Sequence, residues 1–282
     1  MIERRGSRLS VRGVSYRHEG APSAVLEGID LEVTPGEVVA LTGASGSGKS
    51  TLLQVLAGLE PPSRGVVSLD GQDVSDERGR VALRARVGLL FQSPERQFFA
   101  RTVAEEVGFA LANRGMSLEE AKGPVARALK SVGLAPADLL ARSPFTLSGG
   151  EMRRVAIASV VVGEPELLLL DEPLAGLDRE GRAGVASVVA SFAARGCGVV
   201  IATQDVDDVS AIASRALHLD AGRAVAGWEW EPAAAWLARR LGESGFAAAR
   251  DARDLDELAA SVVEGLRGVD GSGGVDGSRG SA

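Results

Sequence analysis

Gly43-Ala44-Ser45-Gly46-Ser47-Gly48-Lys49-Ser50-Thr51 lies between two apolar segments of this chain. It follows the apolar run Val38 to Leu41 and leads into a leucine- and valine-rich segment over 52–56, which places it at a turn from a strand into a helix. Its three glycines let the backbone fold tightly and point successive N–H groups inward, and the following helix adds its positive N-terminal end. We therefore interpret the segment as a P-loop that binds a polyphosphate.

The last three residues of the P-loop suit a nucleoside triphosphate with Mg²⁺. Lys49 places a cation at the β- and γ-phosphates, Ser50 offers its hydroxyl to Mg²⁺, and Thr51 stands at the α-phosphate region. The alternative is a Gly/Ser-rich turn without a ligand. The strand before the segment and the helix after it favour the P-loop.

The composition bounds the classes of function. The chain has 282 residues, a net charge of −7 and one cysteine, Cys197. The acidic balance argues against a nucleic-acid partner, because phosphate backbones are normally met by clustered Lys and Arg. One cysteine excludes an internal disulfide and fits a reducing compartment. The sequence holds no run of about 18 apolar residues, so we expect any membrane contact to go through another protein.

We expect one large nucleotide-binding domain over 1–226, with a helical subdomain at about 93–146. After Gly227 the composition changes to Ala, Arg and Trp, and an apolar helical stripe that ends at Leu266 predicts a helical extension over 227–267. This helix either folds back on the core or mediates dimerisation. Residues 268–282 are mostly Gly, Ser and Asp, and we expect them to be disordered.

Alternation and turn residues predict strands on both sides of the P-loop. They cover 9–17, 29–33, the hairpin strand 66–69 and 87–91, the last of which delivers Gln92 to its end. Two further buried strands are predicted over 167–170 and 199–203, followed by a terminal hairpin that begins with 215–219. Tyr16 ends the first strand, where the simpler interpretation is an ordinary aromatic on a β-face rather than a base-stacking residue.

Capping boxes predict the helices between these strands. Thr102 with Glu105 opens a helix to about residue 113, and Ser117 with Glu120 opens a second that Gly123-Pro124 interrupts. The first helix and its approach carry an apolar surface. It is either core packing or a docking groove for a partner helix, and its residues are Phe98, Phe99, Val103, Val107 and Phe109.

Ser148 with Glu151 is a third capping box, worth about 1 kcal/mol, and on local grounds it needs no functional explanation. Gly149 and Gly150 in the first turn are different, because each costs roughly 1 kcal/mol of helix stability relative to Ala. They also expose backbone N–H groups at the positive end of the helix dipole. This arrangement suits a phosphate.

Two acidic residues follow the strand of four leucines at 167–170. At an ordinary surface turn Asp171 and Glu172 would be unremarkable. After a buried strand in a P-loop protein, Asp171 fits a Mg²⁺ ligand and Glu172 fits the base for an attacking water. We favour the functional interpretation.

Taken in order, the motifs resemble the nucleotide-binding subunit of ABC transporters over about residues 7–226. They are the P-loop, Gln92, 147–151, 167–172, 174–178 and the strand that ends at Gln204. Residues 87–107 are similar to the ATPases of energy-coupling factor transporters, which import vitamins and cobalt or nickel ions. The usual form there is Phe-Gln-Asn-Pro-Asp-Asp-Gln, from which Ser93, Glu95 and Arg96 depart.

The resemblance implies an α/β P-loop fold with a mixed sheet core, an antiparallel β subdomain and a helical subdomain. It implies a head-to-tail dimer with two ATP molecules, a second ABC ATPase as partner, and a membrane transporter subunit at the cytoplasmic face of the membrane. Tyr16 then becomes the adenine-stacking residue. Ser148, Gly149 and Gly150 would contact the γ-phosphate held by the partner, and Asp178 would lie at the interface.

Within the chain's own site, the resemblance implies that Gln92 contacts Mg²⁺ and the attacking water. It implies that Glu172 is the catalytic base. Two residues depart from the family. Glu151 replaces the usual Gln of the signature, which the capping box explains. Gln204 replaces a histidine that contacts the γ-phosphate, and Gln cannot carry a positive charge.

The departure at Gln204 leads to two expectations. The leading one is an ATP-hydrolysing subunit that powers import. The site on this chain's own P-loop would then be slow, and a sibling ATPase would complete its own P-loop site with this chain's intact signature. The other is an ATP-dependent clamp whose dimerisation matters and whose hydrolysis does not. A soluble ABC protein acting on the ribosome or DNA is disfavoured by the acidic charge and the absence of a basic arm.

Overall fold

The structure, a computed structural model, describes residues 6–205, 209–210 and 212–225. The chain divides into two units, Met1–Trp228 and Glu229–Ala282. The second unit lies wholly outside the described residues. The helical extension predicted over 227–267 and the tail over 268–282 therefore remain predictions.

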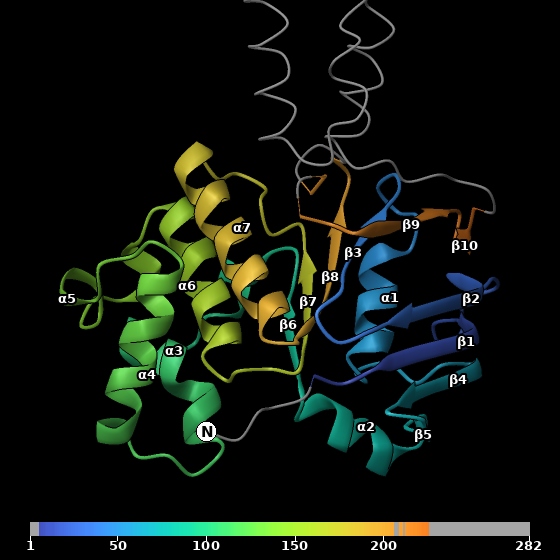
Figure 1. Cartoon of the computed structure of the whole chain (residues 1–282), viewed down its shortest axis with the longest axis horizontal. Coiled ribbons are helices and arrows are strands. Elements are labelled where there is room, and N and C mark those ends of the chain that lie inside the picture. The colour runs from blue at the N-terminus through green and yellow to red at the C-terminus, as the bar shows by residue number, and fades with distance from the viewer. Residues whose placement is uncertain (1–5, 206–208, 211, 226–282) are drawn as a thin grey trace, which may run out of the picture. The chain divides into compact units, whose positions relative to one another are not determined.

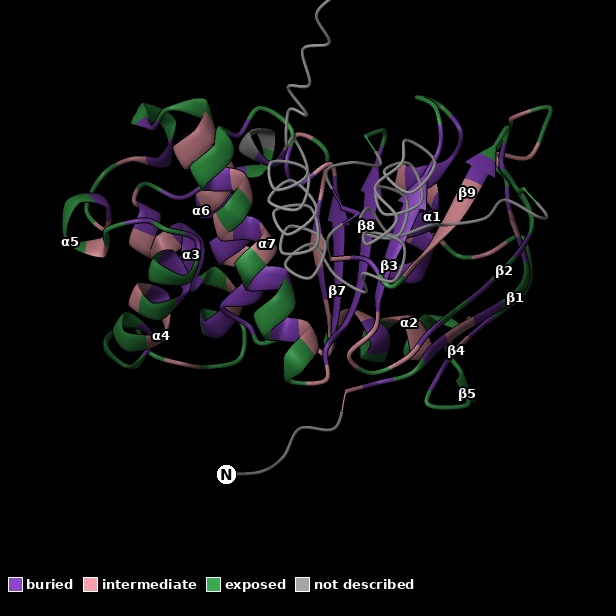
Figure 2. Ribbon diagram, turned by 45° about the horizontal axis from the view of Figure 1, so that its top comes forward, coloured by how far each residue is buried: buried purple, intermediate pink, exposed green. Residues whose placement is uncertain are grey.

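Within the described residues, the central sheet has six strands in the order β10-β9-β3-β8-β7-β6 (Figure 1). Five of them run parallel, and β10 alone is antiparallel to its neighbour β9. The inner strands are buried on both faces, as near-continuous runs of Val, Ile and Leu require (Figure 2). The strand bounds are β3 (Val38–Thr42), β6 (Val87–Leu90), β7 (Leu167–Asp171), β8 (Gly198–Thr203), β9 (Arg215–Asp220) and β10 (Arg223–Ala224).

A second, antiparallel sheet has the order β2-β1-β4-β5. Its strands are β1 (Leu9–Tyr16), β2 (Leu26–Val33), β4 (Arg64–Leu69) and β5 (Gln72–Asp73). In β1 and β2 buried residues alternate largely with exposed ones, which is typical of a sheet with one solvated face. Its buried face packs on α1 (Lys49–Leu56), and the core of both sheets is continuous through the leucines of that helix. Helix α1 thus lies between the two sheets (Figure 1).

The helical layer forms on the other side of the central sheet (Figure 1). Its core is α3 (Val103–Ala112), α4 (Leu118–Ser131) and α6 (Gly149–Val161), which pack on one another. The remaining helices are α2 (Glu77–Arg84), α5 (Pro136–Leu139), α7 (Arg179–Ala194) and the 3-10 turns η1 (Pro94–Gln97) and η2 (Pro144–Thr146). No helix in the described part of the chain is long and apolar enough to cross a membrane.

The three predicted capping boxes are confirmed at Thr102, Ser117 and Ser148. The predicted interruption at Gly123-Pro124 is wrong, because α4 runs through it. Gly123 has no Cβ to clash with the proline ring. Apolar residues of α4, including Val125 and Leu129, are buried in the helical layer, so packing offsets the lost backbone hydrogen bond.

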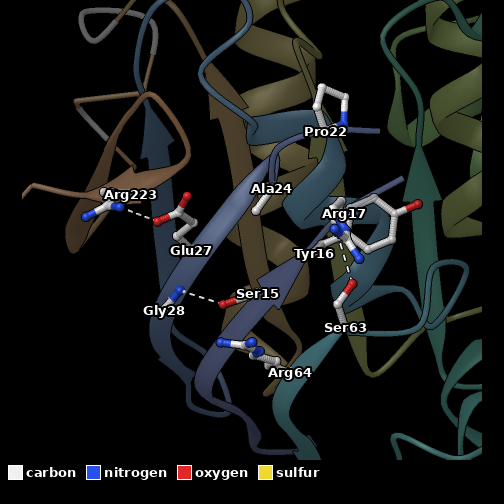
Figure 3. Close-up of a pocket in the computed structure, with 10 residues that line it drawn as sticks. All are labelled: Ser15, Tyr16, Arg17, Pro22, Ala24, Glu27, Gly28, Ser63, Arg64 and Arg223. Carbon is white, nitrogen blue, oxygen red and sulfur yellow. Dashed lines mark hydrogen bonds and ion pairs between the residues drawn. The ribbon is translucent and has the colours of Figure 1, made fainter. Parts of the chain in front are cut away.

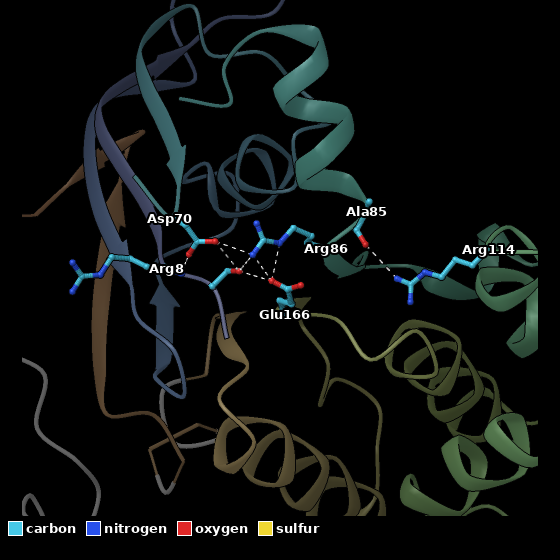
Figure 4. A network of polar contacts seen from close by, with 7 residues as sticks. Arg8, Asp70, Ala85, Arg86, Arg114 and Glu166 are labelled. Atoms are coloured by element: carbon cyan, nitrogen blue, oxygen red, sulfur yellow. Dashed lines mark hydrogen bonds and ion pairs between the residues drawn. The ribbon is translucent and has the colours of Figure 1, made fainter. Parts of the chain in front are cut away.

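A polar network joins the antiparallel sheet to the central sheet (Figure 4). Arg86 before β6 donates to Glu166 Oε2 at 2.7 Å and to Asp70 Oδ2 at 2.8 Å, and the buried Ser7 hydroxyl also donates to Glu166. Burial alone would raise the pKa of Asp70 and Glu166. The hydrogen bonds and the charge of Arg86 outweigh burial and lower both pKa values below their usual range. The network therefore ties together four separate segments of the chain, at Ser7, Asp70, Arg86 and Glu166.

Candidate functional site

The P-loop follows β3 directly, and its backbone requires glycine at two points. Gly43 has φ 143°, and a Cβ there would stand 2.2 Å from the carbonyl oxygen of Leu219. Gly48 has φ 104°, and a Cβ there would stand 2.8 Å from a methyl of Leu26. Both positions combine a left-handed backbone with close neighbours, so the loop can fold only with glycine.

Lys49, the first residue of α1, folds back over the loop. Its side chain is buried, and Nζ donates to the carbonyl oxygens of Gly43 at 2.7 Å and Ala44 at 2.9 Å. Burial lowers the pKa of Lys49, although the charges of Glu172 and Asp171 oppose the shift. The two carbonyl bonds hold the ammonium group at the mouth of the P-loop.

Asp171 ends β7 as a buried carboxylate, and its side chain shares a hydrogen bond with Ser50. Burial raises the pKa of Asp171 despite that bond and the nearby charges of Lys49 and Arg153. A hydroxyl and a carboxylate in contact are hard oxygen donors of the kind that Mg²⁺ prefers. The pair fits the predicted metal site.

Glu172 follows in a left-handed backbone conformation with φ 50°. Its N–H donates to the carbonyl oxygen of Ala202 in β8 at 2.9 Å, and its own carbonyl oxygen accepts from Arg153. Among the described residues, two buried side-chain atoms have no hydrogen-bond partner: Oε1 of Glu172 and Oγ of Ser47 in the P-loop. Glu172 lines the cavity described next, and an unsatisfied buried carboxylate oxygen there fits a bound polar group such as the water beside a nucleotide phosphate.

One cavity of about 260 Å³ gathers the predicted residues from four strand ends. Asp171, Glu172, Gln92 and Gln204 face the P-loop there, and each stands at or after the C-terminal end of its strand. Ligands of open α/β sheets bind at this edge. The P-loop residues that line it are Ser45, Gly46, Gly48, Lys49, Ser50 and Thr51.

Gln204 and Gln92 are both exposed, and both amides are neutral. Gln204 is the residue after β8 that lines the cavity within the described part of the chain, and its amide cannot become a cation. Lys49 and Arg153 are the cations that act on Asp171.

Tyr16, which the resemblance makes the adenine-stacking residue, does not line this cavity. It lines a separate hollow of about 630 Å³ on the antiparallel sheet (Figure 3). Its side chain is 5% exposed, and its hydroxyl donates to Glu60 Oε2 at 2.6 Å. Burial, together with Glu60, raises the pKa of Tyr16 to about 12. A ring held in the core has no free face for a base.

His18 is the exposed ring beside this buried tyrosine. The two rings meet edge to face with centroids 5.0 Å apart, and His18 Nδ1 lies 3.1 Å from the Tyr16 hydroxyl. Strand β1 ends at Tyr16, so the period-two pattern of the strand does not fix the side of the chain on which His18 lies.

The signature residues Ser148, Gly149 and Gly150 begin α6 and do not line the cavity. Ser148 Oγ accepts from the N–H of Glu151 at 3.3 Å, and a Cβ on Gly149 would meet no atom within 4 Å. Hydrogen bonds from Ser148 lower the pKa of Glu151, so this acid stays charged at the helix start. Asp178 caps α7 in the same way, accepting from the N–H of Gly181 at 2.8 Å, and also stands outside the cavity.

Comparison with known proteins identifies the family. Residues 26–175 match the family model described as ABC transporter. The chain belongs to the ABC transporter family. This ABC ATPase is 41% identical over 273 residues to the energy-coupling factor transporter ATP-binding protein EcfA2 of Symbiobacterium thermophilum, covering 89% of this chain and 94% of that protein. It is 42% identical over 223 residues to the EcfA2 of Streptococcus sanguinis, covering 77% and 80%.

Solved ABC ATPases share its fold. The cbiO1 protein of Clostridium perfringens, part of the ABC transporter complex cbiONQ, superposes with a TM-score of 0.71 at 31% identity and covers 86% of this chain and 96% of its own. The dimeric bacterial cassette MJ0796 gives 0.70 at 26%, covering 77% and 96%. A post-hydrolysis state of MJ0796 bound to ADP and phosphate gives 0.69 at 26%, covering 79% and 98%. The α/β P-loop fold of an ABC ATPase is thereby confirmed.

Proposed function

We propose that this ABC ATPase is the ATP-binding and ATP-hydrolysing subunit of an energy-coupling factor importer, and that it powers uptake of a vitamin or metal ion through a membrane subunit. The observation that carries the proposal is the meeting of Gln92, Asp171 and Glu172 with the P-loop in one cavity. The relatives named EcfA2 and the cbiO1 structure support the class of importer.

The chemistry proposed for this cavity follows from its donors. Ser50, Asp171 and the Gln92 amide oxygen would hold Mg²⁺, which neutralises phosphate charge when it is bound. Lys49 and the loop N–H groups would hold the phosphates. Glu172 Oε1, buried without a partner, would accept the proton of the attacking water.

We propose His18 as the residue that contacts the adenine, in place of Tyr16. The imidazole is exposed, and the buried tyrosine supports it from below through the ring contact and the hydroxyl. An imidazole face can stack on a purine. Tyr16 then acts as a support for the contact residue.

The signature residues and Asp178 are proposed to serve a second ATPase subunit. Ser148, Gly149 and Gly150 stand at the start of α6 outside the chain's own cavity, with open space at Gly149. A helix start with free N–H groups binds phosphate. The dimeric structure of the related cassette MJ0796 supports this pairing.

The apolar surface around α3 divides into core and contact residues. Val103 and Val107 are fully buried and Phe98 is 8% exposed, so these pack in the core. Phe99 is 60% exposed and Phe109 45%, and their rings meet edge to face at 4.7 Å. We propose that this aromatic pair receives a helix of the membrane subunit, which would place the chain at the cytoplasmic face of the membrane.

A transport assay tests the importer assignment. The chain is reconstituted in proteoliposomes with the energy-coupling factor membrane subunits of the same organism, and ATP-driven uptake of vitamins and of cobalt or nickel is measured. We expect uptake that Phe109→Asp abolishes while the chain still binds ATP. Assembly with an exporter, or uptake unchanged by Phe109→Asp, contradicts the assignment.

Gln204 favours a second, narrower proposal, in which the chain works beside a sibling ATPase and its own site is slow. In the heterodimer, Ser148→Arg in this chain blocks the sibling's site and removes most hydrolysis. Glu172→Gln affects only the slow site and changes the total rate less than twofold. Equal losses from both variants show that the two sites turn over alike.

A further inference from the structure

Arg153 joins α6 to two residues that line the cavity, Glu172 and Gln92. It lies one turn into α6, and its guanidinium donates to two main-chain carbonyl oxygens: that of Glu172, and that of Gln92 at 3.0 Å. These acceptors follow β7 and β6, which are paired neighbours with Leu90 opposite Leu170. One side chain of the helical layer therefore fastens the ends of two adjacent strands.

The contact matters because the Glu172 backbone is left-handed. This conformation is unfavourable for a non-glycine residue, and it persists only where the surroundings hold it. Glu172 is held at its N–H by Ala202 and at its carbonyl oxygen by Arg153. Without Arg153 the carbonyl oxygen keeps only its bond from the Ala175 N–H, at 3.3 Å, so the peptide after Glu172 is held less firmly.

The guanidinium is the group suited to this task. It presents several N–H donors in a fixed plane and can bond two carbonyl oxygens at once, whereas an ammonium is a point charge on a flexible stem. Its charge also acts on Asp171, where it opposes the effect of burial. The next residue, Arg154, does not contact these strand ends. Its guanidinium donates to the carbonyl oxygens of Gly150 at 3.4 Å and Gly133 at 3.3 Å, both within the helical layer.

We propose that Arg153 is a positioning residue for hydrolysis, which holds the main chains of Glu172 and Gln92 and ties both to the helix that carries Ser148, Gly149 and Gly150. This inference rests on the proposed function. Through Arg153, a contact between the start of α6 and a second nucleotide can change the position of Glu172, the proposed catalytic base of the chain's own site.

Amide hydrogen exchange and single-turnover hydrolysis on the full chain test the proposal. Arg153→Met is compared with Arg153→Lys and with the matched control Arg154→Met. We expect Arg153→Met to speed exchange of the Glu172 amide at least tenfold and to slow single-turnover hydrolysis about tenfold. Affinity for ATP with Mg²⁺ stays within twofold, Arg153→Lys recovers part of the rate, and Arg154→Met leaves both readouts within twofold of wild type.

The opposing results are distinct. Unchanged Glu172 exchange in Arg153→Met, or a loss confined to ATP affinity, overturns the positioning role. Faster exchange throughout the helical layer overturns it too, since that pattern marks general loosening. Failure of the wild type to bind ATP would instead defeat the proposed function, so the two failures are distinguishable.

Discussion

Gly43 shows at the scale of one residue how the loop depends on a missing side chain. Gly43→Ala places a Cβ 2.2 Å from the Leu219 carbonyl oxygen at φ 143°, whereas a Cβ on Gly46, at φ 80°, meets nothing within 4 Å. We predict that Gly43→Ala lowers the free energy of unfolding by at least about 2 kcal/mol and weakens ATP binding, while Gly46→Ala costs about 1 kcal/mol. Urea unfolding measures both, and equal costs would contradict the steric account.

Gln204 is the residue that most affects the expected rate. Because glutamine cannot carry the charge of a histidine, a hundredfold loss in hydrolysis corresponds to about 2.7 kcal/mol of missing transition-state stabilisation. We predict that Gln204→His raises the steady-state rate of the purified chain between tenfold and a hundredfold with little change in ATP affinity. Fast hydrolysis by the wild type refutes the slow-site proposal.

Local chemistry made the P-loop, the capping boxes and the strand-end carboxylates predictable, since each depends on neighbours in sequence. Arg153 carried no such signal, because its partners lie 19 and 61 residues away. The burial of Tyr16 could not be predicted from the sequence for a related reason. Its burial depends on α1 and on Glu60, which the strand pattern does not reveal.

At the scale of one element, the start of α6 combines stability with function. Ser148→Ala and Ser117→Ala remove the same kind of capping box from α6 and α4. We predict that each lowers the free energy of unfolding by about 1 kcal/mol. Only Ser148→Ala should also reduce hydrolysis by the heterodimer, by fivefold or more.

Ser117 is the matched control because it stands outside the cavity and outside the signature. A similar loss of hydrolysis in Ser117→Ala would show that the effect is one of helix stability alone.

Helix α4 shows where prediction from local sequence was wrong. Local propensity predicted an interruption at Gly123-Pro124, but the helix continues there because tertiary packing of its apolar residues stabilises it.

At the scale of the whole molecule, the network of Ser7, Asp70, Arg86 and Glu166 links stability to pH. The usual pKa values of Asp70 and Glu166 are 3.8 and 4.5, and both are lowered in the folded chain. Their contribution is therefore present above those values and is lost as pH falls through the lower, folded ones. Arg86→Met should cost about 1–2 kcal/mol at pH 7, discounted for partial exposure, and clearly less at about pH 3, where the folded carboxylates become protonated.

Arg8→Ala provides the comparison for the network. Its ion pair with Glu32 joins side chains that are 60% and 50% exposed, so we expect a change below about 0.5 kcal/mol at either pH. Urea unfolding of both variants at pH 7 and at about pH 3 measures the difference. A cost of Arg86→Met that does not fall with pH would show that packing, and not charge, gives the network its stability.

Isothermal titration calorimetry of ATP with Mg²⁺ on the purified full chain measures whether the P-loop cavity holds a nucleotide. We predict one ATP per chain, at least a hundredfold weaker binding in Lys49→Ala, and strong dependence on Mg²⁺ that Asp171→Asn removes. Absence of binding by the wild type, or binding that Lys49→Ala leaves unchanged, would contradict the account.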